Sequence, residues 1–405
     1  MDTITHGIVG ALIGKAFFAG HDEPAANGQA ARSDRGARVA IVAATLGAIF
    51  PDCDTLAGPL MHNRLAIMIW HRSITHSLVM LPVWALLLAL LTRVCVRWRG
   101  WQSPSLANLY LIYAVGLGSH VFLDVITSFG TMVWSPVRYA RIAWDWMFIL
   151  DFTLVALALV PQLVAWTLRR PDRQLWRALV VWVAGTGAAF GVYALADAAG
   201  ATFGRWVVGL TSGLVAIAVG VPAIEGWGFA VRRSTWCRIG VLQVAAYIAL
   251  AGFAHHAALA RTETFAEAKH LRVENLGALP QPPSVATWEG LVRTPTGVYR
   301  LPMDLRRAEM PAAIYYADTA NARAISEAGE LHPVQVYLWF ARFPWFRWTE
   351  RDGQRVLDIS DLQFIRTTEK IPSSAAHSGS TSFTMEIVFD RSGKAVSANW
   401  AQPAR

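Results

Sequence analysis

Histidine and aspartate are concentrated in three short stretches of the first third of the chain, inside sequence that is otherwise apolar. The stretches cover residues 51–54, 71–77 and 120–124, and a fourth group, residues 5–7, lies near the N-terminus. Burying an ionisable group in membrane-like sequence is costly, so each group needs a compensating partner. Imidazoles and carboxylates together are the ligands of divalent transition metals. The pattern therefore predicts a single metal site at a membrane boundary.

The clearest spacing is that of His120 and Asp124, which are four residues apart near the end of an apolar segment. On a helix this spacing places both side chains on one face, within reach of the same ion. The alternative is a buried histidine–aspartate hydrogen bond that only orients the helix.

Pro51 predicts that the preceding helix stops, since proline moves the residue before it out of the helical region. Asp52 and Asp54 then lie on a tight loop at the helix end. One of them could simply be a cap. We expect that one ligates or bridges metals, while the other orients a neighbouring histidine.

His71 and His76 are five residues apart, which corresponds to about 140° of rotation on a regular helix. They cannot both ligate one ion from a straight helix. Either residues 73–75 break the helix, or the two histidines serve different ions or different shells; the alternative is two interfacial histidines. Arg72 lies between them and suits a phosphate oxygen, although an arginine at this position could instead contact lipid or a loop.

Two further residues are weaker candidates. His6 lies near the N-terminus, where Thr5 could cap the first helix. Asp151 begins a later apolar segment and is a possible extra ligand or hydrogen-bond acceptor. A helix N-terminal aspartate that favours the helix dipole is the alternative for Asp151.

Composition indicates a membrane protein, because 54% of the 405 residues are hydrophobic and only 16% are charged, against about 25% in soluble domains. The predicted fold class is mainly α: a polytopic helical membrane bundle with a small C-terminal β-rich domain. Residues 4–19 and 39–50 are predicted to be short or re-entrant helices. The predicted spans have apolar cores at residues 77–92, 101–121, 152–168, 178–196, 206–224 and 239–254.

The net charge of +8 indicates contact with anionic lipid head groups, and no nucleic-acid partner is expected, because no basic segment is interleaved with exposed aromatic residues. Arginine clusters at residues 93–99, 169–177 and 232–238 fall on one face when the spans alternate. The positive-inside rule makes that face cytoplasmic. The metal site and the C-terminal domain then lie on the outer, periplasmic face, and Arg138 and Arg141 are exceptions.

Three domains are predicted: a membrane-embedded metal-site domain (1–155), additional transmembrane helices (156–260), and a linker with a β-rich extramembrane domain (261–405). Charges become frequent after residue 260, and Pro280, Pro282 and Pro283 indicate a linker. Residues 334–340, 356–359 and 383–389 are predicted strands. The turn at residues 390–393, followed by residues 394–399, is typical of a hairpin.

These motifs resemble the LexA-regulated, membrane-bound metal-dependent hydrolase family of bacteria. The resemblance covers residues 1–155, and residues 280–288 are similar to the family's proline-rich lead into its C-terminal region. The order of the motifs is more distantly similar to zinc-dependent phospholipase C and related single-strand nucleases, all-helical enzymes that hydrolyse phosphoesters with a zinc cluster. That likeness implies metal ligation by His6, Asp52, His76, His120 and Asp124. The chain departs from the pattern after Asp124, where no later histidine and glutamate ligands are evident.

The sequence therefore predicts a membrane-bound hydrolase of an ester or phosphoester in a lipid-like or lipid-linked substrate, with one to three divalent ions, most plainly zinc. A transporter is a rival hypothesis, but residues 152–168, 178–196 and 206–224 carry no charges for a proton relay. A structural or sensory protein, in which metal only holds the helices together, is another. The metal-ligating candidates are His6, Asp52, His71, His76, His120, Asp124 and Asp151, and the catalytic candidates are Asp52, Asp54 and Arg72.

Overall fold

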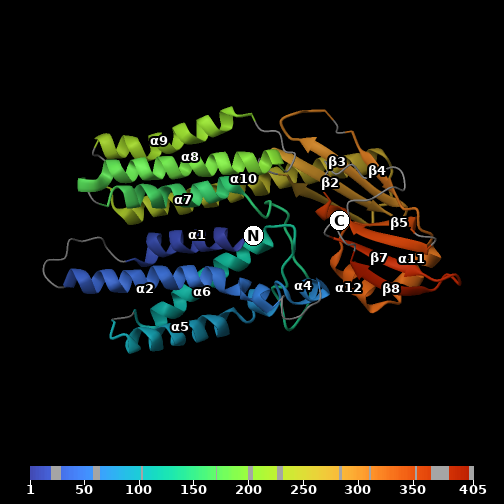
Figure 1. Cartoon of the computed structure of the whole chain (residues 1–405), viewed down its shortest axis with the longest axis horizontal. Helices are drawn as coiled ribbons and strands as arrows, with labels where there is room; N and C mark the ends of the chain where they lie inside the picture. The colour runs from blue at the N-terminus through green and yellow to red at the C-terminus, as the bar shows by residue number, and fades with distance from the viewer. Residues whose placement is uncertain are drawn as a thin grey trace.

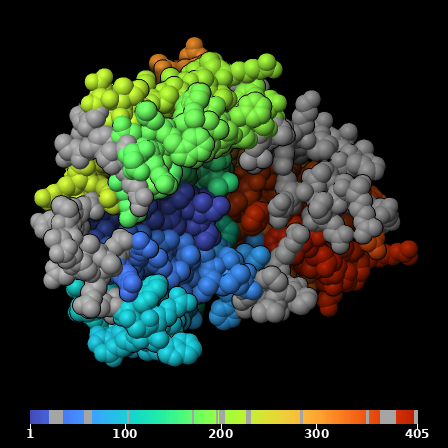
Figure 2. Space-filling model, turned by 60° about the vertical axis from the view of Figure 1, so that its left-hand side comes forward, coloured from blue at the N-terminus to red at the C-terminus, as the bar shows by residue number. Residues whose placement is uncertain are grey.

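The computed structural model describes residues 1–19, 29–57, 64–101, 104–169, 171–198, 204–225, 231–281, 285–309, 312–351, 354–365 and 383–400. Its helices form a bundle, and two antiparallel sheets lie at one end of that bundle (Figure 1). In the space-filling view the C-terminal strands occupy one side of the molecule and the helices the other (Figure 2). The predicted fold class, a helical membrane bundle with a β-rich C-terminal domain, is confirmed.

In the described part of the chain, six helices are long and apolar enough to cross a membrane. Two shorter apolar helices accompany them: α1 (Thr3–Ile13), continued by a π-helical turn (Gly14–Phe18), and α7 (Phe152–Thr167). The six are α2 (Gln29–Ile49) with part of the 3-10 turn that follows it (Phe50–Ala57), α5 (Leu81–Trp98), α6 (Leu106–Val125), α8 (Gln174–Ala198), α9 (Trp206–Glu225) and α10 (Arg233–Ala268).

Two segment lengths differ from expectation. Residues 39–50 were expected to form a short helix, but α2 already begins at Gln29, because a polar stretch ahead of the apolar core is also helical. Residues 152–168 were expected to span the membrane, whereas α7 has 16 residues and falls short of the roughly 20 that a bilayer needs. Hydropathy located both segments and gave the bounds of α7 to within one residue, but it missed the polar start of α2.

Helix ends are set by local side chains. Asp2 caps α1 by accepting the backbone N–H of Thr5, so the cap is Asp2 and not Thr5 as the sequence suggested. Ser105 caps α6 through the N–H of Asn108. Each cap satisfies one of the backbone donors that the first helical turn leaves free.

Close packing holds α1 and α6 next to each other against α2. A Cβ atom on Gly116 of α6 would lie 2.8 Å from the carbonyl oxygen of Ala44, and one on Gly10 of α1 would lie 2.9 Å from the same oxygen. Only glycine permits this approach, because any side chain would push the backbones apart. His6 lies about one helical turn before Gly10, and His120 one turn after Gly116, so these two contacts fix the depth of both histidines.

The C-terminal domain contains two four-stranded antiparallel sheets whose strands follow in sequence order. Helix α10 packs against the first sheet, where Phe265 and Trp288 share a hydrophobic cluster. The hairpin predicted at residues 390–393 is present between β7 and β8. The elements are β1 (Asn275–Pro280), β2 (Thr287–Thr294), β3 (Gly297–Asp304), β4 (Ile314–Ala317), α11 (Ala322–Gly329), α12 (His332–Phe340), β5 (Pro344–Arg351), β6 (Gln354–Asp361), β7 (Thr384–Phe389) and β8 (Ala395–Trp400).

The predicted strand at residues 334–340 is wrong, because these residues belong to helix α12. Proline in the first helical turn favours a helix start. The buried side chains include Val334, Tyr337 and Phe340, which recur every three residues, and this spacing fits a helical face better than the alternation of a strand. By contrast, residues 356–359 and 383–389 lie in or next to β6 and β7, as predicted.

The predicted linker also differs from the structure. Residues 261–268 continue α10, and Pro280 is the last residue of β1. Pro282 and Pro283 lie outside the described residues. The first strand therefore follows α10 after only a short connection, and the C-terminal domain is joined directly to the end of a membrane helix.

The arginine-rich connections lie at the end of the bundle opposite the sheets. Arg97 is in the last turn of α5, Arg169 follows α7, and Arg233 begins α10. Figure 1 shows the end of α5, the α7–α8 connection and the start of α10 far from the C-terminal domain. The alternation of spans assumed from the sequence agrees with this arrangement.

Candidate metal centre

Four buried side chains meet where the 3-10 turn after α2, the segment before α5 and the last turns of α6 approach one another. Asp52, His76, His120 and Asp124 each contribute a donor atom, and these atoms all lie within 4.8 Å of one another. His76, His120 and Asp124 have no exposed side-chain surface. The structure thus brings four of the seven predicted ligands together in one group.

The ring orientation of His120 is set by the backbone of α2. Its Nδ1 lies 2.6 Å from the carbonyl oxygen of Ala48, and since a carbonyl only accepts, Nδ1 must carry the proton. In neutral His120 the Nε2 atom then carries a lone pair that is directed into the group. A hydrogen bond of this kind behind a histidine is the usual arrangement for a metal ligand.

His76 faces His120 across the centre of the group. The two Nε2 atoms are 3.0 Å apart, while Nδ1 of His76 lies 3.4 Å from Oδ2 of Asp54 and 3.0 Å from the hydroxyl of Thr75. Nε2 of His76 is also 3.2 Å from Oδ2 of Asp124. Two lone pairs cannot face each other at this distance unless a proton or a metal ion lies between them.

The electrostatics of the group favour a positive charge. Burial disfavours the imidazolium form of His76, but hydrogen bonds to Asp124, Asp52 and Asp54 outweigh it and raise the pKa of His76 to about 10. Among the described residues, the atoms nearest the buried Oδ2 of Asp124 include the two Nε2 atoms, at 3.2 Å for His76 and 3.5 Å for His120, and neither forms a well-aligned hydrogen bond with it. A buried carboxylate oxygen without a well-aligned donor is uncommon and is available to a cation.

Asp52 and Asp54 occupy different positions although they are two residues apart. Oδ1 of Asp52 lies 3.6 Å from Nε2 of His76, and its other oxygen accepts the hydroxyl of Thr3 at 2.6 Å. Asp54 lies behind His76, and its carboxylate contacts Nδ1 of His71 at 2.9 Å. Asp52 therefore faces the group, while Asp54 orients the two histidines around it.

A break in the helix separates His71 from His76. Helix α4 (Arg64–Trp70) ends before His71, and Ile74–His76 forms a 3-10 turn. Between them, Arg72 has a left-handed backbone with φ of 61°, which is unfavourable for a residue with a side chain. The break allows His76 to enter the group while His71 stays at its edge.

Residues 126–147 form a loop that holds this segment in place. The N–H of Met132 donates to the carbonyl of Arg72 at 2.9 Å, and the N–H of Leu78 donates to the carbonyl of Val133 at 2.9 Å. The position of His76 therefore depends on a loop more than fifty residues later in the chain.

Arg72 is buried beside the group, with 2% of its surface exposed. Its guanidinium pairs with Oδ1 of Asp124 at 3.0 Å and donates to the hydroxyl of Thr127 at 3.0 Å. The sequence suggested that Arg72 could hold a phosphate oxygen. The structure instead places its guanidinium inside the protein, where it positions Asp124.

His6 lies next to the four donors. Its ring stacks on that of His120 with centroids 3.6 Å apart, and its Nε2 is 3.2 Å from Oδ1 of Asp124. The N-terminal amino group of Met1 contacts the same oxygen. His6 thus supports the aspartate from the side opposite His76.

The structure does not bring Asp151 into the group. Its carboxylate caps α7 by accepting the N–H of Leu154 at 2.9 Å and also accepts the hydroxyl of Tyr247 at 2.9 Å. Asp151 is thus a helix N-terminal aspartate, as in the alternative to metal binding, and in addition to favouring the helix dipole it satisfies a free backbone donor.

Sequence reasoning did not find the role of Arg141. This arginine donates to the carbonyls of Met68 and Gly130 at 2.9 Å each, and its guanidinium packs over the rings of Phe129 and Phe340. It ties the loop after α6 to α12 of the C-terminal domain. In the sequence, Arg141 was notable only as an exception to the arginine distribution. Its contacts inside the protein explain that exception.

Comparison with known proteins agrees with the membrane assignment. Residues 1–200 match the family model described as YdjM inner membrane protein, and this stretch includes all four donors of the group. Searches of curated proteins and of solved structures gave no match. The first 200 residues are therefore similar to a family of inner membrane proteins, in agreement with the six helices of the described residues that are long and apolar enough to cross a membrane.

Proposed function

We propose that the protein is a metal-dependent hydrolase that cleaves a phosphoester in a lipid or lipid-linked substrate. The observation that carries the proposal is the pair of facing Nε2 atoms of His76 and His120, 3.0 Å apart, with Oδ2 of Asp124 lying 3.2 Å and 3.5 Å from them. Polar side chains placed in this way contribute little to a hydrophobic core, and their arrangement fits a bound cation.

The donor set fits zinc or a similar ion. Two imidazole nitrogens from His76 and His120 and carboxylate oxygens from Asp52 and Asp124 form a group of four, as in tetrahedral zinc sites. Each histidine has an oxygen acceptor behind its other nitrogen. When bound, such an ion makes water acidic enough to react near neutral pH and neutralises charge on the substrate.

His71 and Asp54 are suited to move the proton. They form a hydrogen-bonded pair at 2.9 Å, and their side chains are 19% and 11% exposed, whereas those of His76, His120 and Asp124 are fully buried. An aspartate that fixes a histidine in one tautomer is the arrangement used for general acid–base catalysis. His71, predicted as a ligand, is therefore assigned the role of proton acceptor.

The position of the group supports a lipid substrate and a location on the periplasmic side. The group lies at the ends of the spans, near the C-terminal domain, and the arginine-rich connections lie at the opposite end. By the positive-inside rule the group faces the periplasm. His71 and Asp54 are partly exposed, as contact with a phosphoester at the lipid boundary requires.

Metal analysis coupled to a hydrolysis screen tests the proposal. Purified protein is expected to contain tightly bound zinc or a similar ion, and the double variant His120→Ala, Asp124→Ala is expected to lose it. Hydrolysis of phospholipid substrates should stop with a chelator and return with added zinc. Bound metal without hydrolysis of any lipid phosphoester would instead support a metal that only holds the helices together. Unchanged metal content in the double variant would remove the site.

A further inference from the structure

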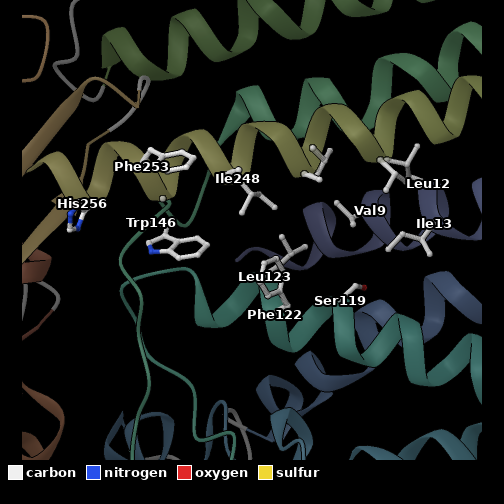
Figure 3. A pocket seen from close by; sticks show the side chains of 15 residues that line it. Val9, Leu12, Ile13, Ser119, Phe122, Leu123, Trp146, Ile248, Phe253 and His256 are labelled. Carbon is white, nitrogen blue, oxygen red and sulfur yellow. The ribbon is translucent and has the colours of Figure 1, made fainter. Parts of the chain in front are cut away.

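A long apolar groove lies between α1, α6 and α10 and has a volume of about 800 Å³. Figure 3 shows its lining side chains, with Val9 and Leu12 from α1, Phe122 and Leu123 from α6, and Ile248 from α10 pointing toward the same space. The volume falls within the range of roughly 300–1,000 Å³ that is typical of ligand pockets. Apart from Ser119, His256 and the indole nitrogen of Trp146, its lining side chains are hydrocarbon or glycine.

The groove opens to the surface of the spans. Phe122 on one rim is 42% exposed and Phe253 on the other is 77% exposed, whereas Val9 and Leu123 in the floor are buried. Helix α1, one of the short helices, contributes the buried Val9 to this floor. In an inner membrane protein this surface contacts lipid, and the groove is continuous with it.

The groove has a polar end and an apolar end. His256 and Trp146 line it on the side of the C-terminal domain, while Leu12 and Ile13 lie at the other end (Figure 3). Tryptophan commonly marks the level of lipid head groups. The lining residues of α10 run from Val241 to His256, about 22 Å along a helix, which exceeds the roughly 15 Å of one hydrocarbon leaflet.

We propose that this groove binds one acyl chain of a glycerophospholipid, with the head group near Trp146 and His256 and the chain extending toward Leu12. An acyl chain is the apolar ligand available at this depth, and it matches the groove in polarity, length and direction. The site is distinct from the metal centre. The two sites share helices, since α1 and α6 line the groove and also carry His6 and His120.

Photolabelling in lipid nanodiscs tests the proposal. The probe is a phosphatidylethanolamine with a diazirine in the middle of one acyl chain. Ala249 lines the groove from an exposed position, so Ala249→Trp fills the groove without entering a packed core. Ala246 is exposed on the same helix and does not line the groove, so Ala246→Trp is the matched control.

Labelling of Val244 and Ile248, located by mass spectrometry, should fall about tenfold in Ala249→Trp, since losing contact with a few methylene groups changes affinity that much. It should stay within about twofold of wild type in Ala246→Trp. Equal labelling in all three proteins would overturn the proposal, as would equal labelling of Ile248 and the outward-facing Leu242 in wild type. His120→Ala should retain the labelling. The labelling experiment therefore tests lipid binding independently of the hydrolase proposal.

Discussion

The Nε2 atoms of His76 and His120 face each other at 3.0 Å, although the two residues belong to separate segments. Their Nδ1 atoms have oxygen partners on the outer sides of the rings, Asp54 for His76 and the carbonyl of Ala48 for His120. This relationship brings α2, α6 and the segment before α5 together at one group of side chains that could hold a metal ion. It also distinguishes the residues that face this group from those that lie around it.

His76→Ala and His71→Ala are expected to differ in their effects. Removing His76 deletes a ligand, so metal measured by plasma mass spectrometry should be lost together with hydrolysis. Removing His71 leaves the four donors intact, so metal should remain while the hydrolysis rate falls by about 10²–10⁴, the range for a general acid or base. Loss of metal from His71→Ala would show that His71 is a ligand after all.

Gly116→Ala is expected to damage the site from a distance. The new methyl group would meet the carbonyl oxygen of Ala44 at 2.8 Å, and the resulting overpacking should lower the free energy of unfolding by about 1–3 kcal/mol. Since His120 is one turn away, metal content should fall as well. Gly118→Ala is the control, because its methyl group meets only Leu81, at 3.9 Å. Equal thermal unfolding temperatures for the two variants would contradict the packing argument.

The two ends of the bundle should lie on opposite sides of the membrane. Ser392→Cys places a thiol in the exposed β7–β8 turn, and Arg99→Cys places one at the exposed end of α5. Both are made after replacing the native Cys53, Cys95 and Cys237. An impermeant maleimide added to spheroplasts should label the cysteine at position 392 but not the one at position 99. The reverse pattern would place the metal group on the cytoplasmic side.

The C-terminal domain should lose stability as the pH rises above 4. Asp361 is buried, and although it accepts three backbone N–H groups, burial raises its pKa to about 6. The folded state therefore favours the protonated acid, so the free energy of unfolding is highest below the unfolded pKa of about 3.9 and falls as the pH rises through 6. The total change is about 3 kcal/mol, at about 1.4 kcal/mol per pKa unit.

Hydrogen exchange in β6, corrected for intrinsic rates, measures this effect between pH 4 and 7. The variant Asp361→Asn cannot ionise, so its protection should vary less with pH than that of wild type, even if its overall stability is lower. The same pH slope in both proteins would assign the pH dependence to another group.

Spacing along the sequence predicted the structure correctly where the residues concerned belong to one helix or one turn. The four-residue interval between His120 and Asp124 places both on one face of α6, and Pro51 separates α2 from the turn that carries Asp52. Local rules also located the β7–β8 hairpin. They were wrong at residues 334–340, where apolar side chains were read as a strand and the burial period is helical.

The sequence by itself determined that this is a helical membrane protein, because hydropathy and helical periodicity are local properties. It also indicated which histidines and aspartates are costly to bury and therefore need polar partners. The tertiary structure decided their positions. Asp54 stands behind His76, Arg72 supports Asp124, and Asp151 caps α7, because each depends on contacts between segments that only the folded chain brings together. No spacing along one segment encodes which carboxylate reaches which imidazole, since that choice is made by the close approach of α1 and α6 to α2.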